Sequence, residues 1–270
     1  MNSKNYLPYF IEDFRPKPKR RDYLKKLLDA DTAALVEYSR MPIELQYFMI
    51  HSITLESVPI LFLKNSKAGC TSMAHMIFEG YSGHSCGGVI HEERTMLVQG
   101  LLGWRSIQRR LTQENVFTFS ILRMPTSRIV SCFIDFIAEK RNPGAHKLKR
   151  FIEDFDLENR SPSYQFSAFL DAIDAWAEHS EATMDRHWRP QYKNLASDYV
   201  DYNFLGRLEE ISDWYSALRC NLKKNGLKLP SSPILKNSAS IEMQIGKNQQ
   251  KSIERIYARD FELYENSRLT

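Results

Sequence analysis

The feature that most constrains the fold is the succession of a strand, a turn and a helix at residues 59–80. A short apolar run, PILFL, leads into the turn LKNSKAGCTS, and the next segment, MAHMIFEGY, has the apolar spacing of a helix. In a turn of small residues, backbone N–H groups can converge on an anion, while the helix N-terminus adds its dipole and a lysine adds countercharge. The pattern predicts a strand at 59–63, a helix from about 72 to 80, and an anion site between them.

A second buried strand is predicted at residues 116–122. Its sequence, VFTFSIL, has the β-branched and aromatic composition of a strand covered on both faces, and it leads into RMP and a predicted helix through Ile137. Later segments predict a helix at 166–179, a strand at 202–206, a helix ending near 225 and a helix at 248–264. Because helices separate the strands, the sequence predicts a single α/β domain: a central parallel β-sheet flanked by helices, with a P-loop-like turn after the first strand.

The remaining segments complete the predicted domain. Residues 81–92 predict a loop with a short returning strand at 88–90, followed by an amphipathic helix to about 111. Residues 141–165 predict a lid or a binding loop. Residues 1–56 are expected to form an N-terminal helical cap of the same domain, and residues 57–270 the rest of it.

Composition narrows the class of protein. The formal charge of +4 is mild for 270 residues and does not indicate a nucleic-acid partner. Apolar runs are too short to span a bilayer, and the N-terminus has no secretory pattern. The four cysteines are scattered, with no disulfide framework or paired metal spacing, so a cytoplasmic setting is expected. The sequence gives no indication of the oligomeric state.

The identity of the anion depends on the residues that come directly after the second strand. The turn lacks the G-x-x-x-x-G-K-[ST] pattern of nucleoside triphosphate sites, and the strand at 116–122 ends in Arg123 rather than in a magnesium-binding aspartate. An arginine there repels a metal and attracts a second anion. Two anion sites at the carboxyl ends of two strands suit a nucleotide with two separate phosphate groups, as in 3′-phosphoadenosine 5′-phosphosulfate (PAPS).

The chain resembles the PAPS-dependent sulfotransferases, in particular the carbohydrate branch and its soluble, bacterial-type members. SKAGCTS at 66–72 is similar to the family's 5′-phosphosulfate loop, P-K-x-A/G-C-T-S/N, and LRMPTSRIVS at 122–131 to its 3′-phosphate signature, V-R-D/N-P-x-x-R-L-V-S. Met124 departs from that signature. Further similarity lies in DRHWRPQ at 185–191, FLGRLE at 204–209 and IYARDF at 256–261. Together these segments cover roughly residues 57–266 in the family's order.

The resemblance implies a role for each candidate residue. The loop, comprising Lys67, Ala68, Gly69, Cys70, Thr71 and Ser72, would bind the 5′-phosphosulfate. Arg123 and Ser131 would bind the 3′-phosphate, while Arg128 is either a further ligand contact or a structural residue. No metal takes part.

The acceptor is expected to be a hydroxyl of a saccharide or glycan. Its general base is expected to be His91, with His187 as the rival, because histidine titrates near neutrality. Trp188 could stack on a ligand or lie in the core, and a zinc site of His84, Cys86 and His91 has no standard spacing. The alternatives are a small-molecule kinase of the P-loop type and, because of Met124, a catalytically inactive nucleotide-binding protein.

Overall fold

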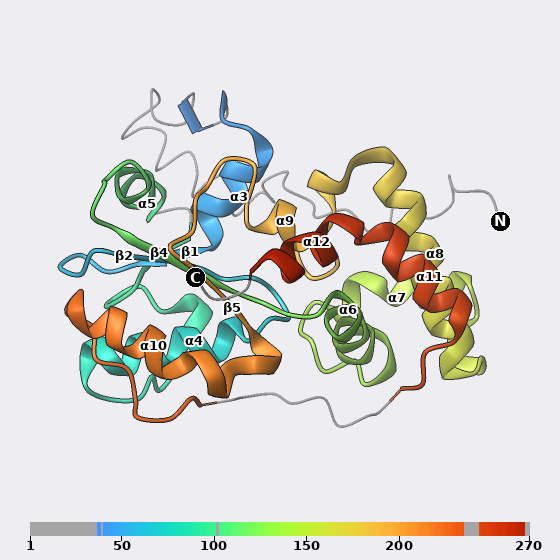
Figure 1. Cartoon of the computed structure of the whole chain (residues 1–270). Helices are drawn as coiled ribbons and strands as arrows, with labels where there is room; N and C mark the ends of the chain where they lie inside the picture. Colours follow the sequence, from blue (N-terminus) through green and yellow to red (C-terminus); the bar gives the residue numbers. More distant parts are fainter. Residues whose placement is uncertain (1–36, 39, 101–102, 235–242, 268–270) are drawn as a thin grey trace.

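The strands form one mixed sheet. The structure is a computed structural model that describes residues 37–38, 40–100, 103–234 and 243–267 (Figure 1). Within these residues the sheet has five strands in the order β3-β1-β2-β4-β5. Their bounds are β1 Ser52–Thr54, β2 Ile60–Leu63, β3 Val98–Gln99, β4 Phe117–Leu122 and β5 Phe204–Arg207.

Only part of this sheet has the predicted parallel arrangement. Strands β2, β4 and β5 run parallel, but β1 is antiparallel to both β2 and β3. The prediction of a wholly parallel sheet is wrong at β1, because residues 55–59 are too few for the crossover that a parallel pair requires and suit a hairpin instead. The turn that is predicted to bind an anion consequently comes after the second strand and not the first.

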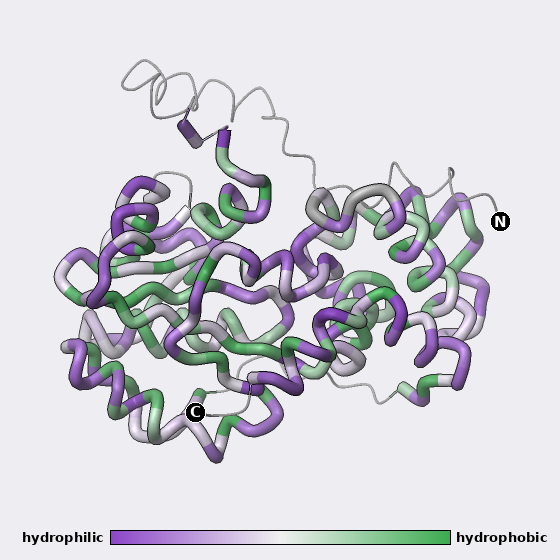
Figure 2. Tube along the Cα trace, turned by 45° about the horizontal axis from the view of Figure 1, so that its top comes forward, coloured by the Kyte–Doolittle hydropathy of each residue, from purple (hydrophilic) through white to green (hydrophobic). Residues whose placement is uncertain are grey.

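Helices cover both faces of the sheet. Helix α5 (Trp104–Leu111) lies over one face with α3 (Ile43–His51), while α4 (Cys70–Ser82) and α10 (Ile211–Lys224) lie over the other (Figure 1). Strand β2 shows why both faces need cover, since Ile60 and Phe62 pack toward α4 and α10 while Leu61 and Leu63 pack toward α3 and α5. Strand β2, with the sequence ILFL, is correspondingly one of the hydrophobic stretches of the trace (Figure 2).

A second, helical core lies beside the sheet. Helices α6 (Pro125–Phe133), α7 (Lys149–Asp154), α8 (Pro162–Ser180) and α11 (Lys247–Ile256) enclose it (Figure 1). Helix α6 passes into a π-helical turn at Ile134–Ala138, and α12 (Ala258–Asn266) runs back from this core toward the sheet. The sheet therefore occupies one half of the described molecule.

Three local predictions need correction. Residues 88–90 form no strand, and a 3-10 turn spans Ile90–Glu92. The segment 141–165 is not a plain loop: it contains 3-10 turns at Ala145–Leu148 and Leu157–Asn159 as well as α7, because Phe151, Ile152 and Leu157 are buried in the helical core. The helix expected at 248–264 is divided into α11 and α12 at Tyr257.

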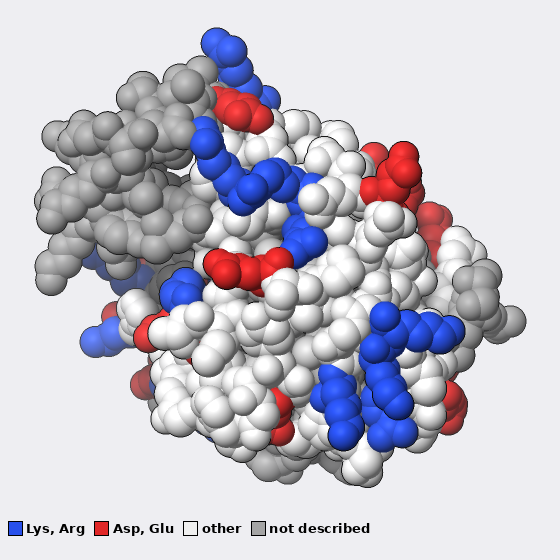
Figure 3. Space-filling model, turned by 90° about the vertical axis from the view of Figure 1, so that its left-hand side faces the viewer, with Lys and Arg blue, Asp and Glu red and all other residues white. Residues whose placement is uncertain are grey.

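Most of the expected N-terminal cap lies outside the described residues. Of residues 1–56, the described part includes α3 and β1, and β1 belongs to the sheet. No helix among the described residues is both long and apolar enough to cross a bilayer. On the face shown in Figure 3, Lys and Arg side chains gather in separate groups, with uncharged and acidic surface between them.

Candidate active site

The turn after β2 has a backbone that few residues can adopt. Gly69 has φ +74° and precedes α4 directly, and a Cβ atom at this position would lie 2.9 Å from Leu208 Cδ1. Lys67 also lies in the left-handed region, with φ 64°. The first N–H groups of α4 have no acceptor within the helix, and Gly69 has no side chain to cap them. The turn therefore presents backbone donors beside the Lys67 side chain.

Arg123 brings the second predicted anion site into contact with the first. Strands β2 and β4 pair in parallel, with Leu63 opposite Ser120, so their carboxyl ends lie at the same edge. From the residue after β4, Arg123 Nη1 donates to the carbonyl oxygen of Lys67 at 3.1 Å. The two turns, which more than fifty residues separate in the sequence, thus meet.

A buried amide pair fixes this junction. Asn65 Nδ2 donates to Gln191 Oε1 at 2.8 Å, and the same oxygen accepts the Arg123 backbone N–H at 3.0 Å. Gln191 Nε2 in turn donates to the Arg123 carbonyl at 2.8 Å. Gln191 belongs to α9 (Gln191–Asn194), whose first N–H groups, those of Gln191 and Tyr192, are bound by the carboxylate of Asp260 at 2.6 and 2.9 Å.

Helix α6 carries both Arg128 and Ser131, and the two side chains differ in their hydrogen bonds. Arg128 is only 1% exposed, and its guanidinium donates to the carbonyl oxygens of Ser66 and Arg186, each at 2.9 Å. These two hydrogen bonds connect α6 to the turn after β2 and to the segment before α9. Ser131 is buried on the same helix, and its hydroxyl has no hydrogen-bond partner among the described residues.

Lys67 has an acidic partner in the structure. Its Nζ lies 2.8 Å from Asp135 Oδ2, in the π-helical turn after α6. Burial opposes ionisation of Asp135, but hydrogen bonds from Lys67 and Asn142 hold the pKa of its carboxyl below the usual value. An anion at the turn would compete with Asp135 for Lys67.

The two candidate histidines have different neighbours. His91 Nε2 lies 3.0 Å from the hydroxyl oxygen of Thr71. Burial, followed by the charges of Lys64 and Arg186, lowers the pKa of His91 to about 4. His187 Nδ1 lies 2.6 Å from Asp185 Oδ1, and its ring packs on Phe136 with centroids 4.8 Å apart. Burial lowers the pKa of His187, and Asp185 opposes that effect.

Of the other sequence candidates, Trp188 and His84 lie outside the junction of the two turns, whereas Met124 directly follows Arg123. Trp188 is 1% exposed and packs edge-on against Phe136 and Phe169, so it belongs to the core. The side chain of His84 lies against Phe78, and the described residues contain no cluster of three or more potential metal ligands. Met124 precedes α6 without a side-chain cap, and Glu209 accepts its N–H at 3.1 Å.

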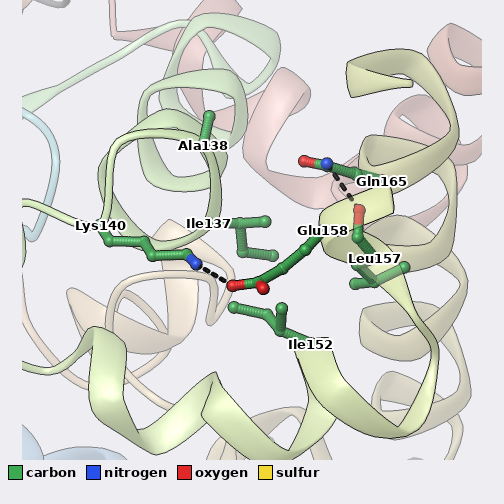
Figure 4. A pocket seen from close by; sticks show the side chains of 7 residues that line it. All are labelled: Ile137, Ala138, Lys140, Ile152, Leu157, Glu158 and Gln165. Carbon is green, nitrogen blue, oxygen red and sulfur yellow. Dashed lines mark hydrogen bonds and ion pairs between the residues drawn. The ribbon is translucent and has the colours of Figure 1, made fainter. Parts of the chain in front are cut away.

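A cavity in the helical half is separate from this site (Figure 4). Its volume is about 200 Å³, and an ion pair between Lys140 and Glu158 spans it. It contains none of the predicted site residues, and its lining consists of Ile137, Ala138, Lys140, Ile152, Leu157, Glu158 and Gln165.

Sequence reasoning missed Asn65 and the structural roles of Gln191 and Asp260. All three lie in or beside motif segments. An asparagine, a glutamine or an aspartate in such a segment indicates only that a polar residue lies near a site. Their buried positions and mutual distances depend on the folded chain.

Comparison with known proteins identifies the class. The protein-family model described as "Sulfotransferase family" matches residues 51–266, and the chain belongs to this family. Searches of curated proteins and of solved structures return no significant match. The match begins just before β1 and therefore includes every described strand of the sheet.

Proposed function

We propose that the protein is a PAPS-dependent sulfotransferase that transfers a sulfuryl group to a hydroxyl of a saccharide or glycan. The observation that carries this proposal is the contact between Arg123 and the Lys67 carbonyl, which joins two sets of donors at one edge of the sheet. Lys67, Arg123, Ser131 and the backbone of the turn offer hydrogen-bond donors and positive charge to a ligand. Such a set fits a nucleotide with phosphate groups at both its 3′ and 5′ positions.

The residues of the turn would act on the charge that develops during transfer. As the acceptor oxygen bonds to sulfur, the bond from sulfur to the bridging oxygen of the 5′-phosphate breaks, and negative charge builds on that oxygen. Lys67 and the N–H groups at the start of α4 would stabilise it. The hydroxyl proton passes to the base, and the products are a sulfate ester and adenosine 3′,5′-bisphosphate.

Two histidines are candidates for the base. We assign the role to His91, because its Nε2 lies 3.0 Å from the hydroxyl oxygen of Thr71, in the loop that would bind the 5′-phosphosulfate, and because its lowered pKa leaves the ring neutral and able to accept a proton. His187 remains the alternative, because Asp185 holds Nδ1 and leaves Nε2 able to accept a proton. A kinase would instead require a magnesium-binding carboxylate where Arg123 stands.

Calorimetric titration with adenosine 3′,5′-bisphosphate tests the donor site. We expect micromolar binding by the wild-type protein, weaker or no binding of Mg-ATP, and a loss on the order of tenfold or more in Arg123→Ala, because a charged hydrogen bond to the 3′-phosphate is removed. Arg109→Ala, an exposed substitution on α5, is the matched control and should bind as the wild type does.

Activity is then measured by transfer of labelled sulfate from PAPS to a panel of saccharides. Preference for Mg-ATP, or equal bisphosphate affinity in Arg123→Ala and wild type, would refute the donor assignment. Tight bisphosphate binding together with no hydrolysis or transfer of the sulfuryl group would favour the catalytically inactive alternative.

A further inference from the structure

A buried glutamine near the candidate base takes no part in the proposed reaction. Gln99 ends β3, the strand at one end of the sheet order, and it pairs with Ile53 of β1. The residue is 1% exposed. Because burying an amide is unfavourable unless its donors and its acceptor have partners, the contacts of Gln99 indicate what the side chain does.

The amide nitrogen of Gln99 binds the turn that carries His91 on both sides of that residue. Its Nε2 donates to the carbonyl oxygens of Ile90 at 2.9 Å and of Glu93 at 2.7 Å. The 3-10 turn itself spans only Ile90–Glu92. Hydrogen bonds within a short 3-10 turn have poor geometry, so a side chain that binds both ends of the turn adds to its rigidity.

The amide oxygen of Gln99 binds a cation. Lys64 is the first residue after β2, and its Nζ donates to Gln99 Oε1 at 2.6 Å. The backbone N–H of Lys64 donates to the carbonyl oxygen of His51 at 3.1 Å, so the base of this side chain is fixed as well. Gln99 therefore connects the carboxyl end of β2 with the turn that carries His91.

Only one orientation of the amide suits all three neighbours. Nε2 is the donor that the two carbonyl groups require, and Oε1 is the acceptor that the ammonium group requires. A glutamate at this position would still accept from Lys64 but would not donate to Ile90 and Glu93. A leucine of similar size would do neither, so the two substitutions separate the contacts.

The ammonium group of Lys64 acts on the protonation of His91. Burial lowers the pKa of His91 most, and the charge of Lys64 comes next. Smaller effects in the same direction come from other segments packed around the ring, through Arg186, His75 and His187. Near its own turn, Glu92 and Arg94 are exposed, and the carboxylate of Glu93 accepts backbone N–H groups. A contact that fixes Lys64 therefore affects how readily His91 takes up a proton.

We propose that Gln99 is a positioning residue for sulfuryl transfer, which fixes the turn that carries His91 and keeps the Lys64 ammonium group beside that turn. This rests on the proposed function, in which His91 is the base. The ring accepts a proton from the acceptor only when the turn holds it at the reacting hydroxyl, and a displacement of about 1 Å costs about two orders of magnitude in rate. The nearby positive charge keeps the ring unprotonated at mildly acidic pH.

Substitutions at Gln99 and Lys64 test this role. Gln99→Leu removes the three hydrogen bonds of the side chain, Gln99→Glu keeps only the one from Lys64, and Lys64→Met removes the charge but leaves the bonds to the turn. Gln249→Leu is the matched control. Gln249 is also buried, and its Nε2 donates to the Ser163 carbonyl and the Ser167 hydroxyl in the helical half.

Two properties are measured. Assays with PAPS and a saccharide acceptor give kcat and KM as a function of pH for the wild type, the Gln99 variants and the control. Proton–nitrogen correlation spectra of the histidine rings give the protonation midpoint of His91 in all proteins, including Lys64→Met. The signals of His91 are those that are absent in His91→Ala. Titration with adenosine 3′,5′-bisphosphate checks that each variant is folded.

We expect both Gln99 variants to lose on the order of 10–100-fold in kcat, with KM and bisphosphate affinity unchanged within about twofold. The wild-type ring of His91 should take up its proton at about pH 4. This midpoint should rise by on the order of one unit in Gln99→Leu and Lys64→Met, and the acid limb of kcat/KM in Gln99→Leu should move with it. It should stay below 6.5, because the ring remains buried. Gln249→Leu should keep the wild-type kcat and midpoint.

Other outcomes overturn the proposal. Equal losses of kcat in Gln99→Leu and Gln249→Leu would reflect reduced stability alone, and a raised KM with unchanged kcat would assign Gln99 to substrate binding. An unchanged midpoint of His91 in Lys64→Met would exclude the effect of the ammonium group. If Gln99→Leu does not fold, Gln99→Glu supplies the kinetic result and Lys64→Met the titration.

Failure of the proposed function gives a different result. A wild-type protein that neither binds adenosine 3′,5′-bisphosphate nor transfers a sulfuryl group refutes that function. The titration of His91 requires no ligand and no activity, so it still decides whether Gln99 and Lys64 control the protonation of this ring.

Discussion

His91 and His187 reach the site from distant parts of the chain and are held in different ways. His91 stands in a 3-10 turn with its Nε2 against Thr71, whereas His187 lies two residues after Asp185 and shares a hydrogen bond with it. Sequence reasoning found both residues, because a histidine near a predicted anion site is a natural base. It placed His91 first and His187 as the rival, but it gave no sign of the charges of Lys64 and Arg186 that lower the pKa of His91, because only the fold brings them near.

Replacing His91 tests the assignment of the base. We expect His91→Ala to lower kcat by about 10²–10⁴-fold with little change in bisphosphate affinity, because proton transfer and not donor binding is lost. The folded pKa of about 4 means that the base is neutral at pH 6–7, so kcat/KM should fall only as the pH drops through about 5 to 4.

The measurement is a pH–rate profile for the wild type, His91→Ala and His187→Ala. An acid limb centred near 6.5, the ordinary pKa of histidine, would contradict the assignment. A large loss of kcat in His187→Ala, with His91→Ala nearly as active as the wild type, would transfer the role to His187.

The elements around the turn were predictable to different degrees. Strands β2 and β4 and helix α4 each carry a strong local signal, an apolar run or an apolar helical face, and the sequence predicts them within a few residues. Strand β1 has three residues and no readable period, so its antiparallel pairing could not be anticipated. Helix α7 was missed because its buried side chains are interspersed with charged residues.

Gly69 allows a test at the level of the turn. We expect Gly69→Ala to lower the free energy of unfolding by about 1–2 kcal/mol and to weaken bisphosphate binding, because alanine is strained at φ +74° and its Cβ meets Leu208. Urea denaturation and calorimetry measure the two effects.

Gly83→Ala is the control for backbone strain alone. Gly83 ends α4 with φ +79°, and a Cβ atom there would meet nothing within 4 Å. This variant should lose a similar or smaller amount of stability and keep its affinity for the nucleotide. Equal binding by Gly69→Ala and wild type would show that the turn is not part of the donor site.

At the scale of the whole molecule, residues from motifs that lie far apart in the sequence contact one another and together stabilise the two turns. Gln191 joins Asn65 to Arg123, and Asp260 on α12 holds the start of α9. Tyr257 donates to the carbonyl of Trp188 at 2.6 Å and fixes the same segment. The order of these motifs in the sequence indicated the family. Their structural role could not be predicted, because it depends on long-range contacts that no local sequence pattern indicates.

Removing the carboxylate of Asp260 tests that support. We expect Asp260→Ala to lower the free energy of unfolding by about 2–5 kcal/mol, because two buried N–H groups lose their acceptor, and to weaken bisphosphate binding through Gln191. Glu262→Ala changes an exposed residue of the same helix and should have little effect. Urea unfolding that is unchanged in Asp260→Ala would refute this role.

The long range of this support has a consequence for biosynthesis. Asn65 and Gln191 are 126 residues apart, and Gln191 and Asp260 a further 69. At a translation rate of about 5–20 residues per second, the turn would leave the peptidyl-transferase centre roughly 6–25 s before its first partner and wait several seconds more for the second. A nascent chain would therefore carry the turn after β2 long before the residues that support it are present, so the proposed nucleotide binding would be one of the last properties that the growing polypeptide acquires.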